Sequence, residues 1–261
     1  MILDEILANK RREVAERRSR RARLDLDGLP PTRGFANRLR QPGVAFIAEF
    51  KRRSPSGGLI RPEATPADVA RIYAESGAAA LSVLTDETYF GGSDADLREA
   101  RAACQTPVLR KDFVIDSYQV YEARAIGADA VLLIVRALDD ADLRNLLQLT
   151  RELGMDAVVE THSRGEVERA LAAGAEIVGV NNRDLDTLTT DVSLAPRLRE
   201  LVPSDHVFVA ESGISSPDHI RVLADSSVDA VLIGESLLRA TDPGARLREL
   251  ITAGAPQGIR T

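Results

Sequence analysis

Residues 127–135, GADAVLLIV, contain the pattern that decides the fold of this chain. A glycine and an alanine stand before a short run of apolar residues. Glycine just past the end of a helix adopts the left-handed backbone conformation at little cost. A strand that is apolar at nearly every position is typical of a parallel sheet whose two faces are both covered. The stretch therefore predicts the joint between a helix and a buried parallel strand.

The same unit recurs along the chain. Gly77-Ala78 and Gly174-Ala175 repeat the joint, whereas Ser227-Val228 replaces it in the last unit, where we expect a looser or differently built joint. Helix starts are indicated by capping residues and prolines at Thr65-Pro66, Ser93, Asp116-Ser117, Ser163 and Ser216-Pro217. Eight strands are predicted, at residues 44–50, 79–84, 107–111, 130–135, 157–160, 176–181, 207–211 and 230–234.

Eight strand–helix units in a chain of this length predict an α/β fold, a single (β/α)8 TIM barrel. The barrel would occupy residues 44–252 of one domain that spans 1–261, with a helical extension over residues 1–43. A doubly wound open sheet is the alternative. It would show a glycine-rich phosphate turn after its first strand, and residues 54–58, SPSGG, are too irregular for that fingerprint.

Composition excludes several classes of function. The net charge of −6 argues against general binding of nucleic acid, which usually needs a basic domain. The lone Cys104 forms no internal disulfide, and three scattered histidines make no metal-ligand pattern. No long apolar segment or leader predicts a membrane partner, so we expect a cytoplasmic protein. The sequence leaves the oligomeric state open, and a monomer is compatible with it.

The first 24 residues carry eight cationic and four acidic side chains. Such a basic run can bind membranes or nucleic acid. Ile2, Leu3, Ile6, Leu7 and Val14 nevertheless recur at helical spacing and form an apolar stripe. We therefore favour an extra helix that packs on the barrel and exposes a basic face.

The chain has only three lysines against 31 arginines, and two of the three close apolar strands. These are Lys51, after the first predicted strand, and Lys111, at the end of the third. Lysine offers a compact ammonium group whose proton affinity depends on burial, whereas the guanidinium of arginine stays protonated. Both lysines are therefore candidates for proton transfer.

Further polar side chains stand at the carboxyl ends of the predicted strands, where barrels of this kind place their chemistry. Those with candidate chemistry are Glu49, Lys51, Lys111, Glu160, Asn181, Glu211 and Ser212. Because strand side chains alternate between faces, Leu109, Val158 and Val209 should fill the barrel below these groups. Ion pairs that merely close the barrel mouth are the alternative. Acids and bases from several strands favour proton-transfer catalysis, since burying so many charges is costly.

Glycines at the ends of the last two strands indicate a phosphate site. Gly213 and Gly234 each stand at a strand exit, just before a predicted helix start. Backbone N–H groups at such positions can hold a phosphate, and the seventh and eighth loops are the usual phosphate site of this fold. Two ordinary tight turns are the alternative.

These residues resemble the signature of the indole-3-glycerol-phosphate synthase family. The similar stretches are residues 46–56 (FIAEFKRRSPS), 81–86 (LSVLTD) with 89–93 (YFGGS), 109–113 (LRKDF), Glu160, 181–185 (NNRDL) and 211–214 (ESGI). They follow the family's order between about residues 44 and 243. Two positions depart from its pattern: Leu188 stands where the family often has an aromatic residue, and Ser227 replaces a common glycine.

The resemblance implies a reaction of tryptophan biosynthesis that uses no metal or organic cofactor. A phosphorylated small molecule, 1-(2-carboxyphenylamino)-1-deoxyribulose 5-phosphate, would close to indole-3-glycerol phosphate with loss of CO2 and water. Lys111 would be the general acid at the ketone oxygen, and Glu160 the base in rearomatisation or dehydration. Glu49 and Lys51 would assist departure of the hydroxyl group. Asn181, Glu211 and Ser212 would position the substrate, and Arg183 would pair with its carboxylate. Gly213, Gly234, the backbone at Glu235 and Ser54 would bind the phosphate. Phe90, Phe113 and Leu133 would form an apolar slot, although Leu133 could equally belong to the core.

Two other functions compete with this one. Another sugar-phosphate barrel, either an isomerase or a Schiff-base aldolase that uses Lys51 or Lys111, would carry similar groups. A non-catalytic barrel that binds a phosphorylated ligand is the second alternative, although a binder has little need for both Lys111 and Glu160.

Overall fold

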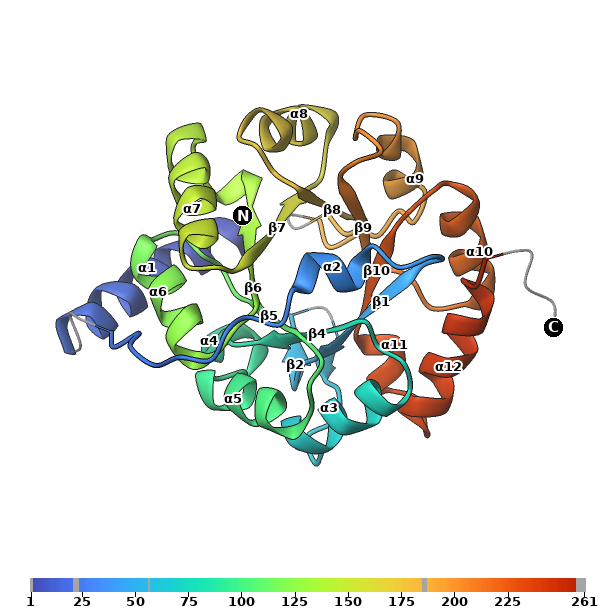
Figure 1. Ribbon diagram of the computed structural model, residues 1–261, viewed down its shortest axis with the longest axis horizontal. Coiled ribbons are helices and arrows are strands. Elements are labelled where there is room, and N and C mark those ends of the chain that lie inside the picture. Colours follow the sequence, from blue (N-terminus) through green and yellow to red (C-terminus); the bar gives the residue numbers. More distant parts are fainter. Residues whose placement is uncertain (1, 21–23, 56, 185–186, 257–261) are drawn as a thin grey trace.

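The computed structural model describes residues 2–20, 24–55, 57–184 and 187–256, so Ser56 and Leu185 of the family-like stretches lie outside it. Eight parallel strands close into a barrel in the order β1, β10, β9, β8, β7, β6, β5, β4 (Figure 1). Their bounds are β1 Ala45–Phe50, β4 Ala80–Leu84, β5 Val108–Lys111, β6 Ala130–Ile134, β7 Asp156–Thr161, β8 Ile177–Asn181, β9 Val207–Glu211 and β10 Ala230–Ile233. The predicted (β/α)8 barrel is confirmed. The open sheet is excluded, because β1 pairs with both β10 and β4.

Helices connect the strands around the outside of the ring. They are α3 Pro66–Glu75, α4 Glu87–Phe90, α5 Asp94–Ala103, α6 Ser117–Ile126, η1 Val135–Ala137, α7 Asp140–Glu152, α8 Arg164–Ala172, α9 Leu194–Arg199, α10 Pro217–Asp225, α11 Glu235–Leu238 and α12 Pro243–Ala253. The predicted starts are confirmed, because the side chains of Thr65, Ser93, Asp116, Ser163 and Ser216 each accept a backbone N–H of the first turn. A hairpin of β2 Arg53–Ser54 and β3 Gly58–Leu59 follows β1.

The three glycine joints and the serine joint of the last unit are built alike. Gly77, Gly127 and Gly174 have φ angles of 96°, 93° and 89°. Ser227 also takes a positive φ, 57°. Val228 donates its backbone N–H to the carbonyl of Leu223, and the residue after each of the three glycines donates in the same way to a carbonyl of its preceding helix. The expectation of a different last joint is therefore wrong. Serine there accepts a left-handed backbone that glycine would adopt more cheaply.

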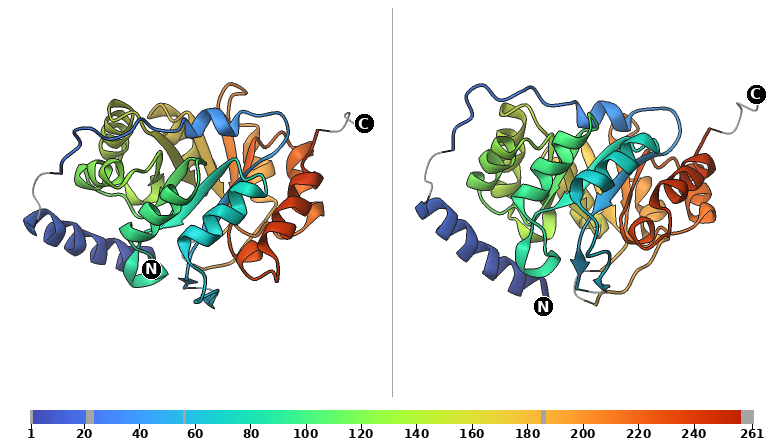
Figure 2. Two further views of the ribbon diagram at one scale, coloured as in Figure 1. Left: turned by 60° about the horizontal axis from the view of Figure 1, so that its bottom comes forward. Right: turned by 90° about the horizontal axis from the view of Figure 1, so that it is seen from below.

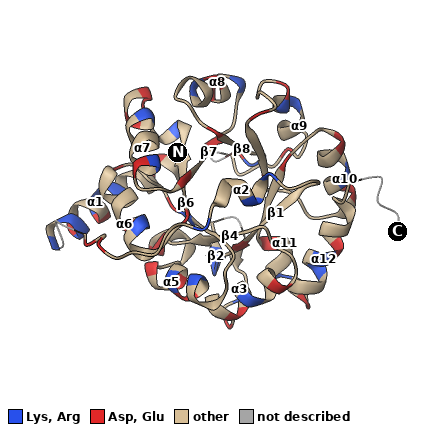
Figure 3. Cartoon of the chain, in the orientation of Figure 1, with Lys and Arg blue, Asp and Glu red and all other residues tan. Residues whose placement is uncertain are grey.

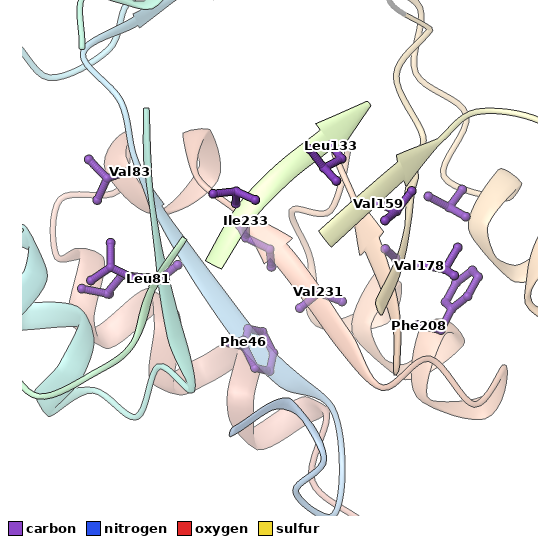
Figure 4. Close-up of a cluster of buried hydrophobic side chains, with 14 of the residues drawn as sticks. Phe46, Leu81, Val83, Leu133, Val159, Val178, Phe208, Val231 and Ile233 are labelled. Carbon is purple, nitrogen blue, oxygen red and sulfur yellow. The ribbon is translucent and has the colours of Figure 1, made fainter. Parts of the chain in front are cut away.

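Alternate side chains of the strands feed two separate cores. Outward-facing residues such as Phe46, Leu133, Phe208 and Val231 pack against the helices (Figure 4). The inward-facing set includes Ile47, Leu109, Leu132, Ile134, Val158, Ile177, Val209 and Leu232. The inward positions predicted for Leu109, Val158 and Val209 are thus confirmed, and these side chains form the floor beneath the polar strand ends.

The two ends of the barrel are covered differently. Helix α2, Phe35–Leu39, lies across the amino-terminal end, where Phe35 and Leu39 are fully buried in the inner core (Figures 1 and 2). Helix α1, Ile2–Arg20, lies at the opposite end, on the same side as the β2–β3 hairpin (Figure 2). The packed extra helix is confirmed by the burial of Leu3, Ile6, Leu7 and Val14. The open mouth of the barrel is therefore bordered by α1 and the hairpin.

The outer helices carry acidic and basic residues interspersed with one another (Figure 3). This mixture is in keeping with the modest net charge of −6. Among the described residues, no helix combines the length and the apolar character that crossing a membrane requires.

Candidate active site

A cavity of about 430 Å³ opens at the carboxyl ends of the strands. The structure brings every predicted site residue except Leu133 to its lining: Glu49, Lys51, Ser54, Phe90, Lys111, Phe113, Glu160, Asn181, Arg183, Glu211, Ser212, Gly213, Gly234 and Glu235. Parallel strands end at one edge of the barrel, so groups far apart in the sequence converge there. Within the described residues, no cluster of His, Cys, Asp or Glu side chains is arranged to hold a metal ion.

Leu133 does not reach the cavity. It is fully buried in the outer core, between β6 and the helices (Figure 4). Its neighbours Leu132 and Ile134 point inward and line the cavity instead. Period-two alternation along the strand decides this, and the slot assignment of Leu133 is wrong.

Lys111 lies at the centre of the charged groups. Its Nζ is 2.8 Å from Oε2 of Glu160 and 2.8 Å from Oε2 of Glu211. Burial disfavours an ammonium group, but the charges of Glu160, Glu211 and Glu49 outweigh burial and raise the pKa of Lys111 above its usual range. The residue is therefore a cation held between carboxylates that come from two other strands.

The two carboxylates that share Lys111 differ in their surroundings. Burial opposes ionisation of Glu160, yet Lys111 and His162 lower the pKa of Glu160 to about 2. Burial raises the pKa of Glu211 to about 7, and the charge of Glu160 adds to this effect. Asn181 donates its amide N–H to Glu160 at 3.2 Å, whereas Oε1 of Glu211 has no hydrogen-bond partner among the described residues. Glu160 thus favours its ionised form more strongly than Glu211 does.

A second ion pair lies on β1. Nζ of Lys51 donates to Oε1 of Glu49 at 2.7 Å, as their shared strand face predicts. The hydroxyl group of Ser82 lies 3.3 Å from the other carboxylate oxygen of Glu49. Ser82 is fully buried on β4 and fixes Glu49 from below, a contact that could not be predicted from the sequence.

Two glycines make room for the carboxylates. A Cβ atom on Gly179 of β8 would lie 2.5 Å from Oε1 of Glu211, and one on Gly234 would lie 2.7 Å from Oε1 of Glu49. Neither distance is sterically tolerable without moving the carboxylate. Gly179 was not singled out from the sequence, where it reads as one residue of an apolar strand.

The loops after β8 and β9 carry the left-handed backbone of the site. Ser212 and Gly213 have φ angles of 65° and 76°, and Leu188 has 59°. Arg183 donates its backbone N–H to Oδ1 of Asn181 at 3.0 Å, which orients the Asn181 amide toward Glu160. A non-glycine residue at positive φ is uncommon, so this loop geometry is specified by its contacts.

An apolar wall faces the charged groups. The rings of Phe90 and Phe113 lie 6.2 Å apart between centroids and are tilted by 38°. Leu3 and Ile6 from α1 line the cavity beside them. The wall therefore joins the N-terminal helix to the barrel and offers a surface on which a flat aromatic group can pack.

Lys10, the third lysine, is a structural residue that the sequence analysis missed. Its side chain is 3% exposed, and its Nζ lies 2.8 Å from Asp86 and 2.9 Å from Asp112. Burial opposes ionisation of Asp112, but Lys10 and Arg110 lower the pKa of its carboxyl group to about 2. Because Asp112 directly follows Lys111, this ion pair ties α1 to the strand end that presents the central lysine.

Replacing Lys10 by methionine should lower the free energy of unfolding by about 3 to 5 kcal/mol, because two buried carboxylates lose their cation. The pKa of an aspartate in an unfolded chain is about 3.9. The lowered pKa of Asp112 therefore stabilises the fold above about pH 4, and this contribution is lost as the pH falls toward 2. Urea unfolding at several pH values measures both effects. The variant should lose this part of the acid dependence.

Arg11→Met is the matched control, since Arg11 is exposed on the same helix. It should change the unfolding free energy by less than about 0.5 kcal/mol. An equal cost for both substitutions would show that the buried ion pairs of Lys10 do not stabilise α1.

Comparison with known proteins agrees with this geometry. The family model for indole-3-glycerol phosphate synthase matches residues 3–250. The chain is 50% identical over 254 residues to indole-3-glycerol phosphate synthase 2 of Streptomyces coelicolor, covering 96% of this chain and 98% of that protein. It is 51% identical over 253 residues to indole-3-glycerol phosphate synthase of Nocardioides sp., covering 95% and 97%.

More distant solved structures share the fold. The 3-hexulose-6-phosphate synthase from Salmonella typhimurium superposes with a TM-score of 0.64 at 14% identity, covering 80% of this chain and 98% of that one. Thiamine phosphate pyrophosphorylase from Pyrococcus furiosus gives 0.62 at 16% identity, covering 85% and 96%. At such identities the likeness concerns the barrel alone. The near full-length match at half identity, together with the acid–base groups at the strand ends, shows that the chain belongs to the indole-3-glycerol phosphate synthase family.

Proposed function

We propose that this protein converts 1-(2-carboxyphenylamino)-1-deoxyribulose 5-phosphate into indole-3-glycerol phosphate, CO2 and water. One carbon–carbon bond forms, the bond to the departing carboxylate breaks, and one water is lost. The observation that carries the proposal is Lys111, an ammonium group 2.8 Å from each of two carboxylates in a cavity with an apolar wall. Such a site can give a proton to one atom of a substrate and take a proton from another.

Lys111 acts in ring closure. Because the product lacks the carboxyl group, the ring carbon that bears it is the one that attacks the ketone carbon. Negative charge develops on the ketone oxygen, and the Lys111 ammonium supplies a proton there. Loss of CO2 then returns an electron pair to the ring and restores its aromaticity, so no base is needed for that step.

Glu160 acts in dehydration. This step removes the new hydroxyl group together with one hydrogen of the neighbouring methylene carbon. Glu160 is ionised because Lys111 and His162 lower its pKa, so it can accept that proton. Lys51, held by Glu49 at 2.7 Å, is the cation that can protonate the departing hydroxyl group. Two separate ion pairs thus serve two proton transfers at adjacent carbon atoms.

The remaining lining residues orient the substrate. The tilted rings of Phe90 and Phe113 offer the slot for the anthranilate ring. Arg183, which lines the cavity, is the candidate for its carboxylate, and Asn181 with Glu211 and Ser212 can bind the sugar hydroxyl groups. Glu211 suits this role because the proton it retains, with a pKa of about 7, lets it donate as well as accept.

The phosphate would lie at the loops after β9 and β10, beside Ser54 of the hairpin. Gly213 follows Ser212 in a left-handed conformation, and consecutive N–H groups in such a turn form an anion-binding concavity. Gly234 and the backbone at Glu235 face the same part of the cavity. The side chain of Glu235 pairs with Arg239 at 2.8 Å, so its backbone is the part available to an anion.

Gly213→Val should raise KM by at least about tenfold and change kcat less, because it displaces the phosphate turn rather than the proton-transfer groups. An added Cβ would lie 2.4 Å from Cγ2 of Thr190 at a φ of 76°. Gly165→Ala is the control, since nothing lies within 4 Å of its added Cβ. Steady-state kinetics with inorganic phosphate as inhibitor make the measurement. Non-competitive inhibition, without protection against heat, would place the phosphate elsewhere.

The direct test of the reaction is incubation of the purified protein with the substrate while indole fluorescence is followed. A slow or absent signal with intact substrate rejects the proposal. Reduction with borohydride in the presence of substrate separates the Schiff-base aldolase, because only an imine leaves a covalent adduct on Lys51 or Lys111. We also propose a cytoplasmic location, in keeping with a biosynthetic family and a single cysteine.

A further inference from the structure

His162 is a buried titratable residue that the reaction scheme above does not use as an acid or base. It follows Thr161 of β7 and lies between two carboxylates, with its side chain 2% exposed. Nε2 lies 3.4 Å from Oε1 of Glu160, and Nδ1 lies 3.3 Å from Oε2 of Glu166. The imidazole therefore connects the base of the proposed reaction to a residue on the outer helix α8.

Glu166 is itself held in place. Its Oε2 accepts the backbone N–H of His162 at 2.8 Å, and its Oε1 accepts from Nε of Arg136 at 3.1 Å. Its own N–H is capped by the hydroxyl group of Ser163. With Glu166 fixed by these contacts, the ring of His162 has one orientation in which both nitrogens face a carboxylate.

A neutral imidazole has a single N–H, so one of the two carboxylates would then face a lone pair. A ring that carries a hydrogen on both nitrogens is attracted to both. Nε2 has no hydrogen-bond partner among the described residues and lies 3.4 Å from Oε1, the oxygen that accepts from Asn181, while Oε2 faces Lys111. Every charged or polar neighbour of Glu160 except Glu211 thus favours its ionised form.

The charged groups that face this pair come from several elements. Lys111 of β5 and Glu211 of β9 face Glu160 from inside the barrel. On the outer side, Glu166 faces His162, and Arg136 lies between Glu166 and Asp184, 3.9 Å from the latter. His162 distinguishes the two carboxylates around Lys111, because its Nε2 lies 3.4 Å from Glu160, whereas within the described residues it forms no ion pair with Glu211.

We propose that His162 and Glu166 form a positioning dyad, which orients Glu160 and favours its ionised form over that of Glu211. The proposal rests on the role of Glu160 as the base. It adds a reason why two carboxylates that share one lysine act differently: only one of them is backed by an imidazole. Loss of the dyad should let Glu160 take up the proton and stop acting as a base at mildly acidic pH.

Two substitutions of His162 separate positioning from packing. The amide of asparagine lies close to the place of Nδ1, so His162→Asn keeps the contact with Glu166 and loses the one with Glu160. The amide of glutamine lies close to the place of Nε2, so His162→Gln keeps an N–H donor toward Glu160. Relative to the wild type, kcat/KM of His162→Asn should fall about tenfold further at about pH 6 than at about pH 8.5, and His162→Gln should largely restore the profile.

Each outcome of this experiment decides the matter. An equal loss of kcat/KM at all pH values in both variants means that His162 only fills space, and this result overturns the proposal. A pH profile that is unchanged in both variants overturns it as well. If His162→Asn does not fold by circular dichroism, Glu166→Gln takes its place and should move the profile in the same direction, and no movement rejects the dyad. A wild type that forms no indole rejects the proposed function itself, whereas an active wild type with unaffected variants rejects the dyad alone.

Discussion

Replacing Lys111 by arginine should lower kcat by about 10² to 10⁴, the range for loss of a general acid, with only a modest rise in KM. The ammonium group lies 2.8 Å from each of two carboxylates. A planar guanidinium keeps the charge but not the compact shape, so it cannot place a single proton donor at the same point between the two carboxylates. Steady-state kinetics by indole fluorescence measure the effect.

Phosphate inhibition serves as the control for Lys111→Arg, because phosphate would bind in the loops after β9 and β10. The inhibition constant should stay within about twofold of the wild-type value, which a general loss of structure would not allow. Near-normal turnover in the variant would remove Lys111 from the acid role.

Glu160→Gln should also lower kcat by about 10² to 10⁴. Glutamine keeps the size of the side chain and can still accept from Asn181, but it cannot take a proton. In the wild type the acidic limb of the pH–rate profile marks protonation of Glu160, whose lowered pKa places that limb well below neutrality. The variant should lack this limb over the measurable range.

Glu49→Gln is the matched comparison, because Glu49 is equally buried in the same cavity but contacts Lys51. It should keep the acidic limb and still lower kcat, since it removes the carboxylate that holds Lys51 in place. Identical profiles for the two variants would mean that the carboxylates act as one coupled group.

The barrel and most of its site could be predicted because both depend on local patterns. Apolar strands repeat eight times, a glycine joint precedes several of them, and strand ends necessarily meet at one edge of a barrel. Alternation then placed Leu109, Val158 and Val209 correctly in the inner core. The same rule argues against Leu133, since inward-facing Leu132 and Ile134 flank it on β6.

What the sequence did not reveal depends on partners from distant elements. Lys10 reads as one charge in a basic helix until the fold brings Asp86 and Asp112 beside it. Gly179 is distinguished only by Glu211 of the next strand, which would collide with a side chain there. Ser227 shows the converse, because contacts hold it in a conformation that its own preference disfavours.

The most direct test of the central claim compares the release of CO2 with the formation of indole-3-glycerol phosphate in a single turnover. The wild type should form CO2 and indole-3-glycerol phosphate in equal amounts and nearly in step. Lys111→Arg should slow both equally, because ring closure precedes both losses. Glu160→Gln should release CO2 ahead of the indole product, because only dehydration lacks its base. Simultaneous and equal slowing of both products in Glu160→Gln would contradict the assignment of separate acid and base steps to Lys111 and Glu160.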